Sequence, residues 1–171
     1  MLGNKGLALS NNEIKIGPPR CRGLVFDGDS LLMVRFAPPD DGDHWQIPGG
    51  GAEEGESLTD CLVRELKEET GLVVEPAGFC YLAHVVVGHL VNPHMYFESK
   101  VVGGNLDDAS EMTTEESEWF VERRFVRRTE TLDQQTRPQH GVWDRVWRDR
   151  EDGFLEPIYL GAYTWTGRLL R

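Results

Sequence analysis

The sequence has few cysteines, and none of them is closely paired with another. Three cysteines occur among the 171 residues, namely Cys21, Cys61 and Cys80, and no two of them form a CxxC motif. An odd number of widely spaced cysteines argues against a framework of disulfides of the kind that small secreted domains use. We therefore expect a reducing, cytoplasmic setting.

Long apolar runs are also missing. No apolar stretch approaches the ~18 residues that a membrane-spanning helix requires. The first residues, MLGNKGLALSNNEIKIG, contain no sustained apolar segment of the kind found in a signal peptide. The sequence therefore predicts no membrane partner and no export signal.

Positive charge is scarce as well. The chain has 18 Lys and Arg residues against 29 Asp and Glu residues, which gives a formal net charge of -11. Such a charge repels nucleic-acid polymers and anionic membranes. It is compatible with a small phosphorylated ligand, because a bound divalent cation reverses the sign of the charge locally. We expect a small-molecule partner, and we interpret the arginines concentrated in the C-terminal half as solvated surface.

The length and composition, with 39% apolar and 27% charged residues, fit a single globular domain. Residues 1–19 are expected to form a flexible arm with a short strand around residues 13–16, so that the domain occupies residues 20–171. Alternating patterns predict strands at residues 21–27, 30–37, 79–87 and 94–102, helices at residues 58–70 and 141–152, and a loop at residues 128–139. This order predicts an α+β fold, namely an α/β/α sandwich in which helices flank a central mixed β-sheet.

The helix at residues 58–70 has clear start and stop signals. Ser57 is a suitable N-cap, Asp60 supplies an acidic partner in the first turn, and Gly71 is suited to end the helix. At about 100° per residue, the apolar face contains Leu58, Cys61, Leu62 and Leu66. The opposite face, which we expect to meet water, contains Thr59, Asp60, Val63, Lys67 and Thr70.

Three glutamates of this helix, Glu65, Glu68 and Glu69, extend the apolar face toward the C-terminal end. Two carboxylates ~4 Å apart repel each other by about 4 kcal/mol at an effective dielectric constant of ~20. The arrangement therefore predicts a cation among them, and oxygen ligands favour a hard ion such as Mg²⁺ or Mn²⁺.

Residues near these glutamates are suited to hold their carboxylates in position. Arg64 can orient the glutamates, and Glu56, which precedes the helix, can hold Arg64 in turn. The glycine run at residues 49–51 lets the backbone approach closely, and a carbonyl of this run, for which we take Gly49, is a candidate metal ligand.

The spacing Gly50-x5-Glu56-x7-Arg64-Glu65-Leu66-x-Glu68-Glu69-x-Gly71-Leu72 resembles the Nudix box of MutT-like hydrolases, and WQIPGG before it resembles the usual approach to that box. The resemblance implies a metal-dependent hydrolase that cleaves a nucleoside diphosphate linked to another group. By position it implies Glu65 and Glu69 as metal ligands, Glu68 as a third, and Glu56 and Arg64 as the supporting pair. The general base stays open between Glu69 and the later Glu115, Glu116 and Glu118, of which we choose Glu116.

The substrate is constrained mainly by missing signatures. The region VVVGH lacks the proline that similar ADP-ribose hydrolases carry, and no tyrosine follows where dinucleoside-polyphosphate hydrolases have one. Nucleoside di- and triphosphates remain as the leading class. Arg35 is a candidate for binding phosphate, and Trp45 and Tyr96 are candidates for stacking on a base.

Two other functions remain open. An isopentenyl-diphosphate isomerase shares the fold and requires a catalytic cysteine, for which Cys21 or Cys80 would have to serve. A non-catalytic domain would sense a nucleotide without cleaving it. A third possibility concerns the apolar tail segment IYLGAYTW, which is suited either to complete the sheet or to form a homodimer interface.

Overall fold

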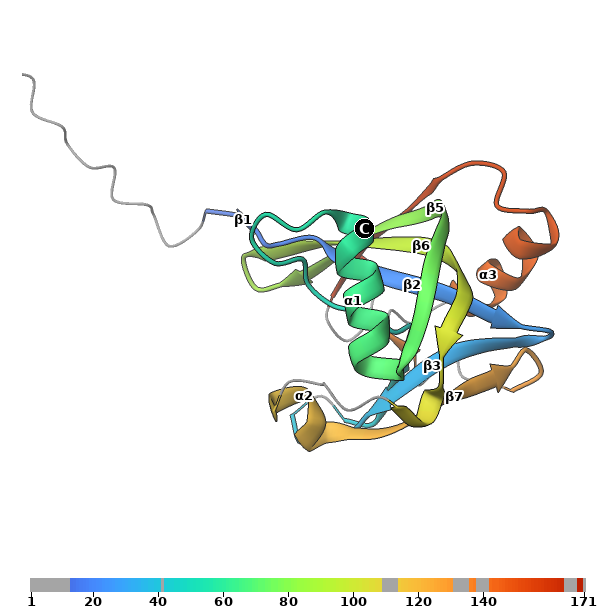
Figure 1. Cartoon of the computed structure of the whole chain (residues 1–171). Coiled ribbons are helices and arrows are strands. Elements are labelled where there is room, and N and C mark those ends of the chain that lie inside the picture. The colour runs from blue at the N-terminus through green and yellow to red at the C-terminus, as the bar shows by residue number, and fades with distance from the viewer. Residues whose placement is uncertain are drawn as a thin grey trace, which may run out of the picture.

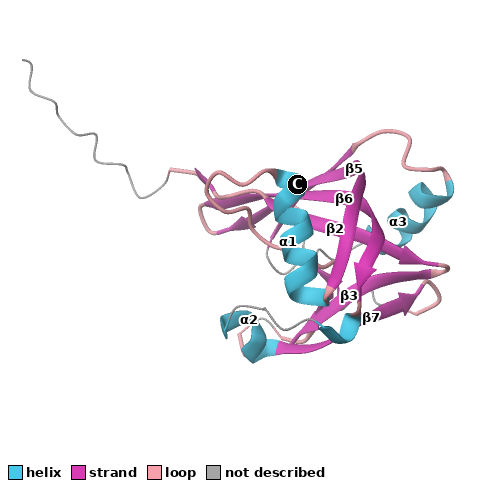
Figure 2. Cartoon of the chain, in the orientation of Figure 1, coloured by secondary structure: helices cyan, strands magenta, loops and turns pink. Residues whose placement is uncertain are grey.

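The computed structural model describes residues 13–40, 42–108, 114–130, 136–137, 142–164 and 169–170, without the side chains of residues 114–116 and 142. The helices are α1 (Leu58–Thr70), α2 (Thr114–Trp119) and α3 (Val142–Glu151), with a short 3-10 helix η1 (Leu106–Asp108). The strands are β1 (Lys15–Ile16), β2 (Arg20–Asp27), β3 (Ser30–Phe36), β4 (His44–Gln46), β5 (Leu72–Val87), β6 (Leu90–Gly104), β7 (Phe120–Arg127), β8 (Thr136–Arg137) and β9 (Ile158–Thr164). Figure 1 and Figure 2 show their arrangement.

The strands form one mixed sheet in the order β8-β4-β3-β2-β6-β5-β9, with β1 paired to β6 and β7 paired to β3. The pairs β2–β6, β5–β9, β4–β8 and β1–β6 are parallel, whereas β2–β3, β3–β4, β3–β7 and β5–β6 are antiparallel. The centre of the sheet is thus formed by β2, from early in the chain, and by β6, from much later.

Helices α1 and α3 pack on opposite faces of this sheet (Figure 1). Successive side chains of a strand point to opposite faces, and in β3 the buried Leu32 packs with α1 while Leu31 and Met33 pack with α3. The core on the α1 face includes Leu62 and Leu66. The layers therefore match the predicted α/β/α sandwich on a mixed sheet.

Strands β5 and β6 are longer than the sequence pattern predicted. Pro76 and Gly78 interrupt the apolar pattern, yet both lie inside β5 at a shift in its register with β6, where an irregular ladder tolerates them. Pro93 lies inside β6 between the residues that pair with β1 and those that pair with β2. A missing N–H therefore breaks no ladder bond on that side.

Three further segments add strands to the sheet. The expected loop at residues 128–139 contains β8, which corrects that prediction, whereas the tail forms β9 beside β5 and thus completes the sheet, one of the two roles predicted for it. The short strand expected in the arm is β1, which pairs with β6. Among the described residues, no helix has the length and apolar character needed to cross a membrane.

Candidate active site

Helix α1 begins and ends where its sequence signals predicted. The Ser57 hydroxyl accepts a hydrogen bond from the Asp60 backbone N–H at 3.1 Å, as an N-cap does. At the other end Gly71 has a φ of 75° and its N–H donates to the Lys67 carbonyl at 2.8 Å. These local bonds fix the start of the helix and therefore the direction in which its glutamates point.

The glutamates of α1 follow the apolar face, as expected. Glu65 and Glu69 are 7% and 2% exposed, and Glu68 is half-buried. On the opposite face Lys67 is exposed, but Thr70 corrects our expectation, because it is fully buried. Its hydroxyl donates to the Leu66 carbonyl, which satisfies the polar group inside the core.

Arg64 bridges the carboxylates on this side of the helix. Its Nε and Nη2 atoms donate to the two oxygens of Glu56 at 2.9 and 3.0 Å. Its Nη1 atom donates to Glu65 Oε1 and to Glu68 Oε2, both at 3.0 Å, and Nη2 also donates to the Gly51 carbonyl at 3.0 Å. The hydrogen bond from Arg64 lowers the pKa of Glu56, so both partners stay charged near neutral pH.

The glycine run lies directly against the two buried glutamates. The Gly49 N–H donates to Glu69 Oε2 at 2.6 Å. Gly49 has a φ of 130°, and a Cβ there would lie 2.0 Å from the Cys21 carbonyl oxygen. A Cβ at Gly50 would lie 2.3 Å from Glu65 Oε2. Glycine is therefore needed at position 49, where a side chain would meet backbone, whereas at position 50 an added Cβ would have to displace the Glu65 carboxylate.

The donor atoms of this site suit a divalent cation. Glu56, Glu65, Glu68 and Glu69 supply hard carboxylate oxygens, which Mg²⁺ and Mn²⁺ prefer. Within the described part of the chain, no three His, Cys, Asp or Glu side chains converge as one metal-binding group. In this arrangement the guanidinium of Arg64 supplies the positive charge beside Glu65 and Glu68.

Arg123 is a member of the site that the sequence analysis did not identify. Its Nη1 atom donates to the backbone carbonyl of Glu69 at 2.6 Å, at the C-terminal end of α1, where a cation is favoured. Burial lowers the pKa of this guanidinium. In the sequence Arg123 is one of several clustered arginines, and no local pattern distinguishes it from the others.

Arg35 and Trp45 lie away from the glutamates. Arg35 forms salt bridges with Asp43 and with Glu122, the latter at 3.0 Å. Trp45 is 4% exposed and packs in the core on the α3 face, with the Arg124 guanidinium 4.9 Å from its ring centroid. In this conformation Arg35 is engaged by carboxylates and the Trp45 ring is covered, so substrate binding by either residue stays a prediction.

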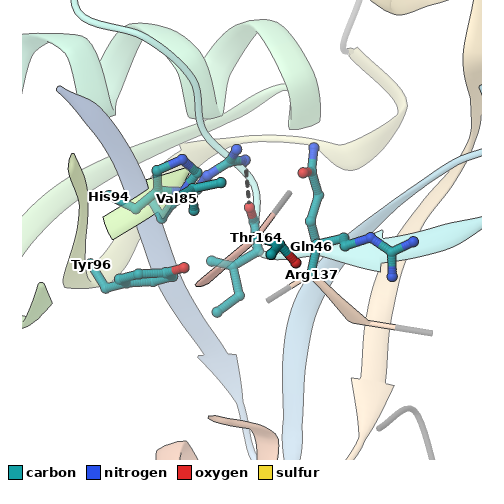
Figure 3. Close-up of a pocket in the computed structure, with 8 residues that line it drawn as sticks. Gln46, Val85, His94, Tyr96, Arg137 and Thr164 are labelled. Atoms are coloured by element: carbon teal, nitrogen blue, oxygen red, sulfur yellow. Dashed lines mark hydrogen bonds between the residues drawn. The ribbon is translucent and has the colours of Figure 1, made fainter. Parts of the chain in front are cut away.

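Tyr96, the third predicted substrate residue, lines a cavity beside the glycine run (Figure 3). The cavity is small, with a volume of about 20 Å³ and an open mouth, and is lined by Arg22, Gln46, Ile47, Val85, His94, Tyr96, Arg137 and Thr164. Arg22 Nη1 donates to the Ile47 carbonyl at 2.9 Å. Since Gly49 N–H reaches Glu69 from the same short segment, the cavity and the carboxylates are connected through residues 47–49.

The later candidates for the general base differ in what the structure describes. Glu118 is exposed at the end of α2. Glu115 and Glu116 belong to the same helix, but their side chains lie outside the described part of the structure. The choice of Glu116 therefore stays a prediction.

The cysteines that an isomerase would need are both buried. Cys21 is fully buried in the core on the α1 face, and Cys80 is 2% exposed in the core on the α3 face. Burial raises the pKa of the Cys80 thiol to about 11, which disfavours the reactive thiolate. Cys80 therefore lacks the surroundings of a catalytic cysteine. The hydrogen bond with Cys61 lowers the pKa of the Cys21 thiol, but Cys21 is fully buried and closed to a substrate in this structure.

Comparison with known proteins gives a match to a family model and matches to individual proteins. A model of the family described as the NUDIX domain matches residues 18–146. Over 90 residues the chain is 40% identical to the mouse (Mus musculus) protein "8-oxo-dGDP phosphatase NUDT18", which covers 44% of this chain and 28% of that protein. Over 107 residues it is 30% identical to the Bacillus subtilis protein "Putative ADP-ribose pyrophosphatase YjhB", which covers 61% of this chain and 50% of that one. The chain thus spans half or less of the length of these relatives.

Solved structures share the fold at low sequence identity. A NUDIX hydrolase from Nitrosomonas europaea superposes with a TM-score of 0.66 at 19% identity, covering 85% of this chain and 94% of that one. A UDP-X diphosphatase superposes with a TM-score of 0.62 at 15% identity, covering 90% and 70% of the two chains. These matches confirm the predicted sandwich fold.

Proposed function

The chain belongs to the NUDIX domain family, and on that premise we propose that it is a divalent-metal-dependent hydrolase of a phosphoanhydride bond in nucleoside diphosphate derivatives. The leading substrates are nucleoside 5′-di- and triphosphates. The observation that carries this proposal is the complete set of charged residues on one side of α1: Glu65 and Glu69 are buried against the glycine run, and Arg64 links Glu56, Glu65 and Glu68.

The buried carboxylates are the groups suited to hold the cation. A divalent cation bound there supplies positive charge to the diphosphate oxygens and acidifies a water molecule. Glu65 and Glu69 are fixed in place, since Arg64 holds the first and the Gly49 N–H holds the second at 2.6 Å. Such fixed charges need no rearrangement when negative charge builds up on the substrate, which is how a preorganised site lowers a barrier.

Arg64 and Glu56 act on the other carboxylates rather than on the substrate. Glu56 accepts two hydrogen bonds from Arg64, and the planar guanidinium then presents Nη1 to Glu65 and Glu68. We assign them a positioning role. The proton acceptor for the attacking water is Glu69 or a residue of α2, with Glu116 as our choice in α2.

The names of the relatives agree with the proposed substrate class at a coarse level. The mouse relative is named for 8-oxo-dGDP and the Bacillus subtilis relative for ADP-ribose. Both names describe a nucleoside diphosphate or a derivative of one, and this common chemistry supports our choice.

The test is a substrate panel with purified protein and Mg²⁺ or Mn²⁺. The panel contains nucleoside di- and triphosphates, nucleotide sugars and dinucleoside polyphosphates, and released phosphate, pyrophosphate and nucleotide are quantified. We expect turnover of one class, and we expect it to be lost with EDTA. We also expect Glu69→Gln to lower kcat at least about 100-fold, since a misplaced reacting group alone costs about that much.

Glu75→Gln is the matched control, because Glu75 is an exposed acid on β5. Nucleotide binding without product release would overturn the hydrolase and favour the nucleotide sensor. Conversion of isopentenyl diphosphate to dimethylallyl diphosphate would favour the isomerase.

A further inference from the structure

Arg22 is a buried cation. It is 3% exposed and lies on β2, where the preceding residue, Cys21, packs on the α1 face. Within the described part of the chain its side chain forms no salt bridge with a carboxylate, and it donates a hydrogen bond to the Ile47 carbonyl at 2.9 Å. Buried charges in proteins are normally paired, since an isolated one costs several kcal/mol. Arg22 therefore retains capacity for a negatively charged partner.

His94 faces the same cavity from β6. It is 5% exposed, and its buried Nε2 atom has no hydrogen-bond partner among the described residues. Buried polar side-chain atoms are usually satisfied. Figure 3 shows His94 and Tyr96 on one side of the cavity and Gln46, Arg137 and Thr164 on the other. The guanidinium of Arg22 and the imidazole of His94 thus offer hydrogen-bonding groups to the same cavity.

The ligand that completes these groups has negative charge and acceptor oxygens. Arg137 also lines the cavity, whereas none of the eight lining residues is acidic. This contrasts with the net charge of -11 of the whole chain. A guanidinium matches the geometry of carboxylate and phosphate oxygens.

We propose that the cavity formed by Arg22, His94 and Tyr96 binds a compact oxyanion, a carboxylate or a phosphate, and thereby selects substrates that carry such a group beyond the diphosphate. This inference rests on the proposed function for its role in catalysis, but the oxyanion site itself does not. The connection through residues 47–49 places the cavity next to the carboxylate site, because Ile47 contacts Arg22 and Gly49 contacts Glu69. The proposed selection requires one substrate to reach both places across this short segment.

The kinetic test uses substrate pairs that differ by one anionic group. UDP-glucuronate is compared with UDP-glucose, and ADP-ribose 2′-phosphate with ADP-ribose. We expect kcat/KM to favour the anionic member of a pair by about 10- to 100-fold, the range that corresponds to one charged hydrogen bond. In Arg22→Met this ratio falls to about 1, mainly through KM.

The ratio is informative even where a variant is less stable, because partial unfolding lowers the rates of both members equally. Arg22→Lys keeps the charge but loses the planar fork, so we expect an intermediate ratio. Arg148→Met is the matched control, because Arg148 is exposed on α3, and it should leave the ratio as in the wild type.

The binding test does not require turnover. The side-chain nitrogen resonances of His94 are followed by NMR while acetate or inorganic phosphate is added. We expect a saturable shift with a Kd of about 1 mM in the wild type and in Arg148→Met, and none in Arg22→Met. The absence of a saturable shift in the wild type overturns the oxyanion site, whatever the enzyme hydrolyses.

The two tests together identify the source of the anion. A saturable shift with a substrate ratio above about 10 assigns the oxyanion to the substrate. A saturable shift with a ratio near 1 overturns the selection of substrate and leaves a site for a free anion. A substrate panel without any turnover contradicts the proposed function, and the NMR result then decides the oxyanion site separately.

Discussion

Arg64 and the glycine run determine how the carboxylates of α1 are held. The guanidinium contacts Glu56, Glu65 and Glu68, while the backbone at Gly49 and Gly50 lies against the other side of the buried carboxylates. The position of each carboxylate oxygen therefore depends on contacts from two directions. Small changes on either side should affect activity more than stability.

Gly50→Ala tests this dependence directly. The added Cβ would lie 2.3 Å from Glu65 Oε2, and the end of a flexible side chain can move more easily than backbone. We expect kcat/KM to fall by about 100-fold, as for a reacting group displaced by about 1 Å, with little change in Tm. Gly78→Ala is the control, because a Cβ there meets nothing within 4 Å. Wild-type activity of Gly50→Ala, measured by initial rates, would contradict the role of Glu65.

His94 should make the stability depend on pH. Burial, together with the nearby charges of Arg22 and Arg20, lowers the pKa of its imidazole to about 2. The depressed pKa means that the unfolded chain binds this proton first, so stability is constant above pH ~6.5 and falls as the pH drops below it. Tyr96, whose pKa is raised by burial to about 12, stays neutral over this range.

The expected loss is up to about 1.4 kcal/mol of unfolding free energy per pH unit below ~6.5. This loss is measured by urea unfolding at several pH values between about 7 and 5, the range in which an unperturbed imidazole titrates. His94→Gln should remove this part of the slope. An equal slope in the wild type and in His94→Gln would show that the imidazole titrates normally in the folded state.

Helix α1 shows what a sequence can predict at the scale of one element. Its N-cap and C-terminal glycine are local signals, and both lie where they were predicted. The strands β5 and β6 were predicted too short, because Pro76, Gly78 and Pro93 read as breaks while the register shifts and strand order that accommodate them depend on distant residues. Local chemistry fixes where α1 begins and ends, whereas the sheet depends on pairing that no local pattern records.

The candidate site divides in the same way. The glutamates and Arg64 lie at helical spacing on α1 and Glu56 lies shortly before it, so their proximity could be predicted from the sequence. Arg22 and His94 come together only because β2 pairs in parallel with β6. Neither residue carries a sequence signal of its own, and the cavity could therefore not be predicted.

Ser57→Ala tests the contribution of the cap to α1. The change removes the acceptor for the Asp60 N–H, so we expect a loss of about 1 kcal/mol in stability, which lowers Tm by about 2–4 °C in a chain of this size. Differential scanning calorimetry measures this change. Lys67→Ala, at an exposed position of the same helix, should remain within about 0.5 kcal/mol of the wild type. An equal effect of both changes would contradict the capping role.

At the scale of the whole molecule the net charge is negative, whereas the local charge is positive at a few positions. The net charge of -11 disfavours polyanions in general. The proposed cation at α1 and the guanidinium of Arg22 would offset this charge at two neighbouring places, which suits a small phosphorylated ligand. The homodimer stays a prediction, with exposed Leu155 and Tyr159 before and in β9 as the apolar residues to examine.

Mg²⁺ or Mn²⁺ should stabilise the folded chain by mass action. A cation at about 100 times its Kd adds about 2.7 kcal/mol, because it binds the folded state and not the unfolded one. We expect Tm to rise with added Mg²⁺ in the wild type and in Glu75→Gln, and to rise much less in Glu69→Gln. A thermal shift of equal size in all three proteins would place the cation elsewhere.

The pairing of β2 with β6 also bears on the order of events during folding. The β5–β6 hairpin closes through a short turn between Val87 and Leu90, whereas β2 joins Arg20 to His94 from far earlier in the chain. Closing the longer loop costs more chain entropy and slows contact formation. In pulse-labelling hydrogen exchange we therefore expect the amides of the hairpin to gain protection first. The walls of the cavity and the contact of the glycine run with α1 would then be assembled in the last step, so that newly made chains acquire their core before their ability to select a substrate.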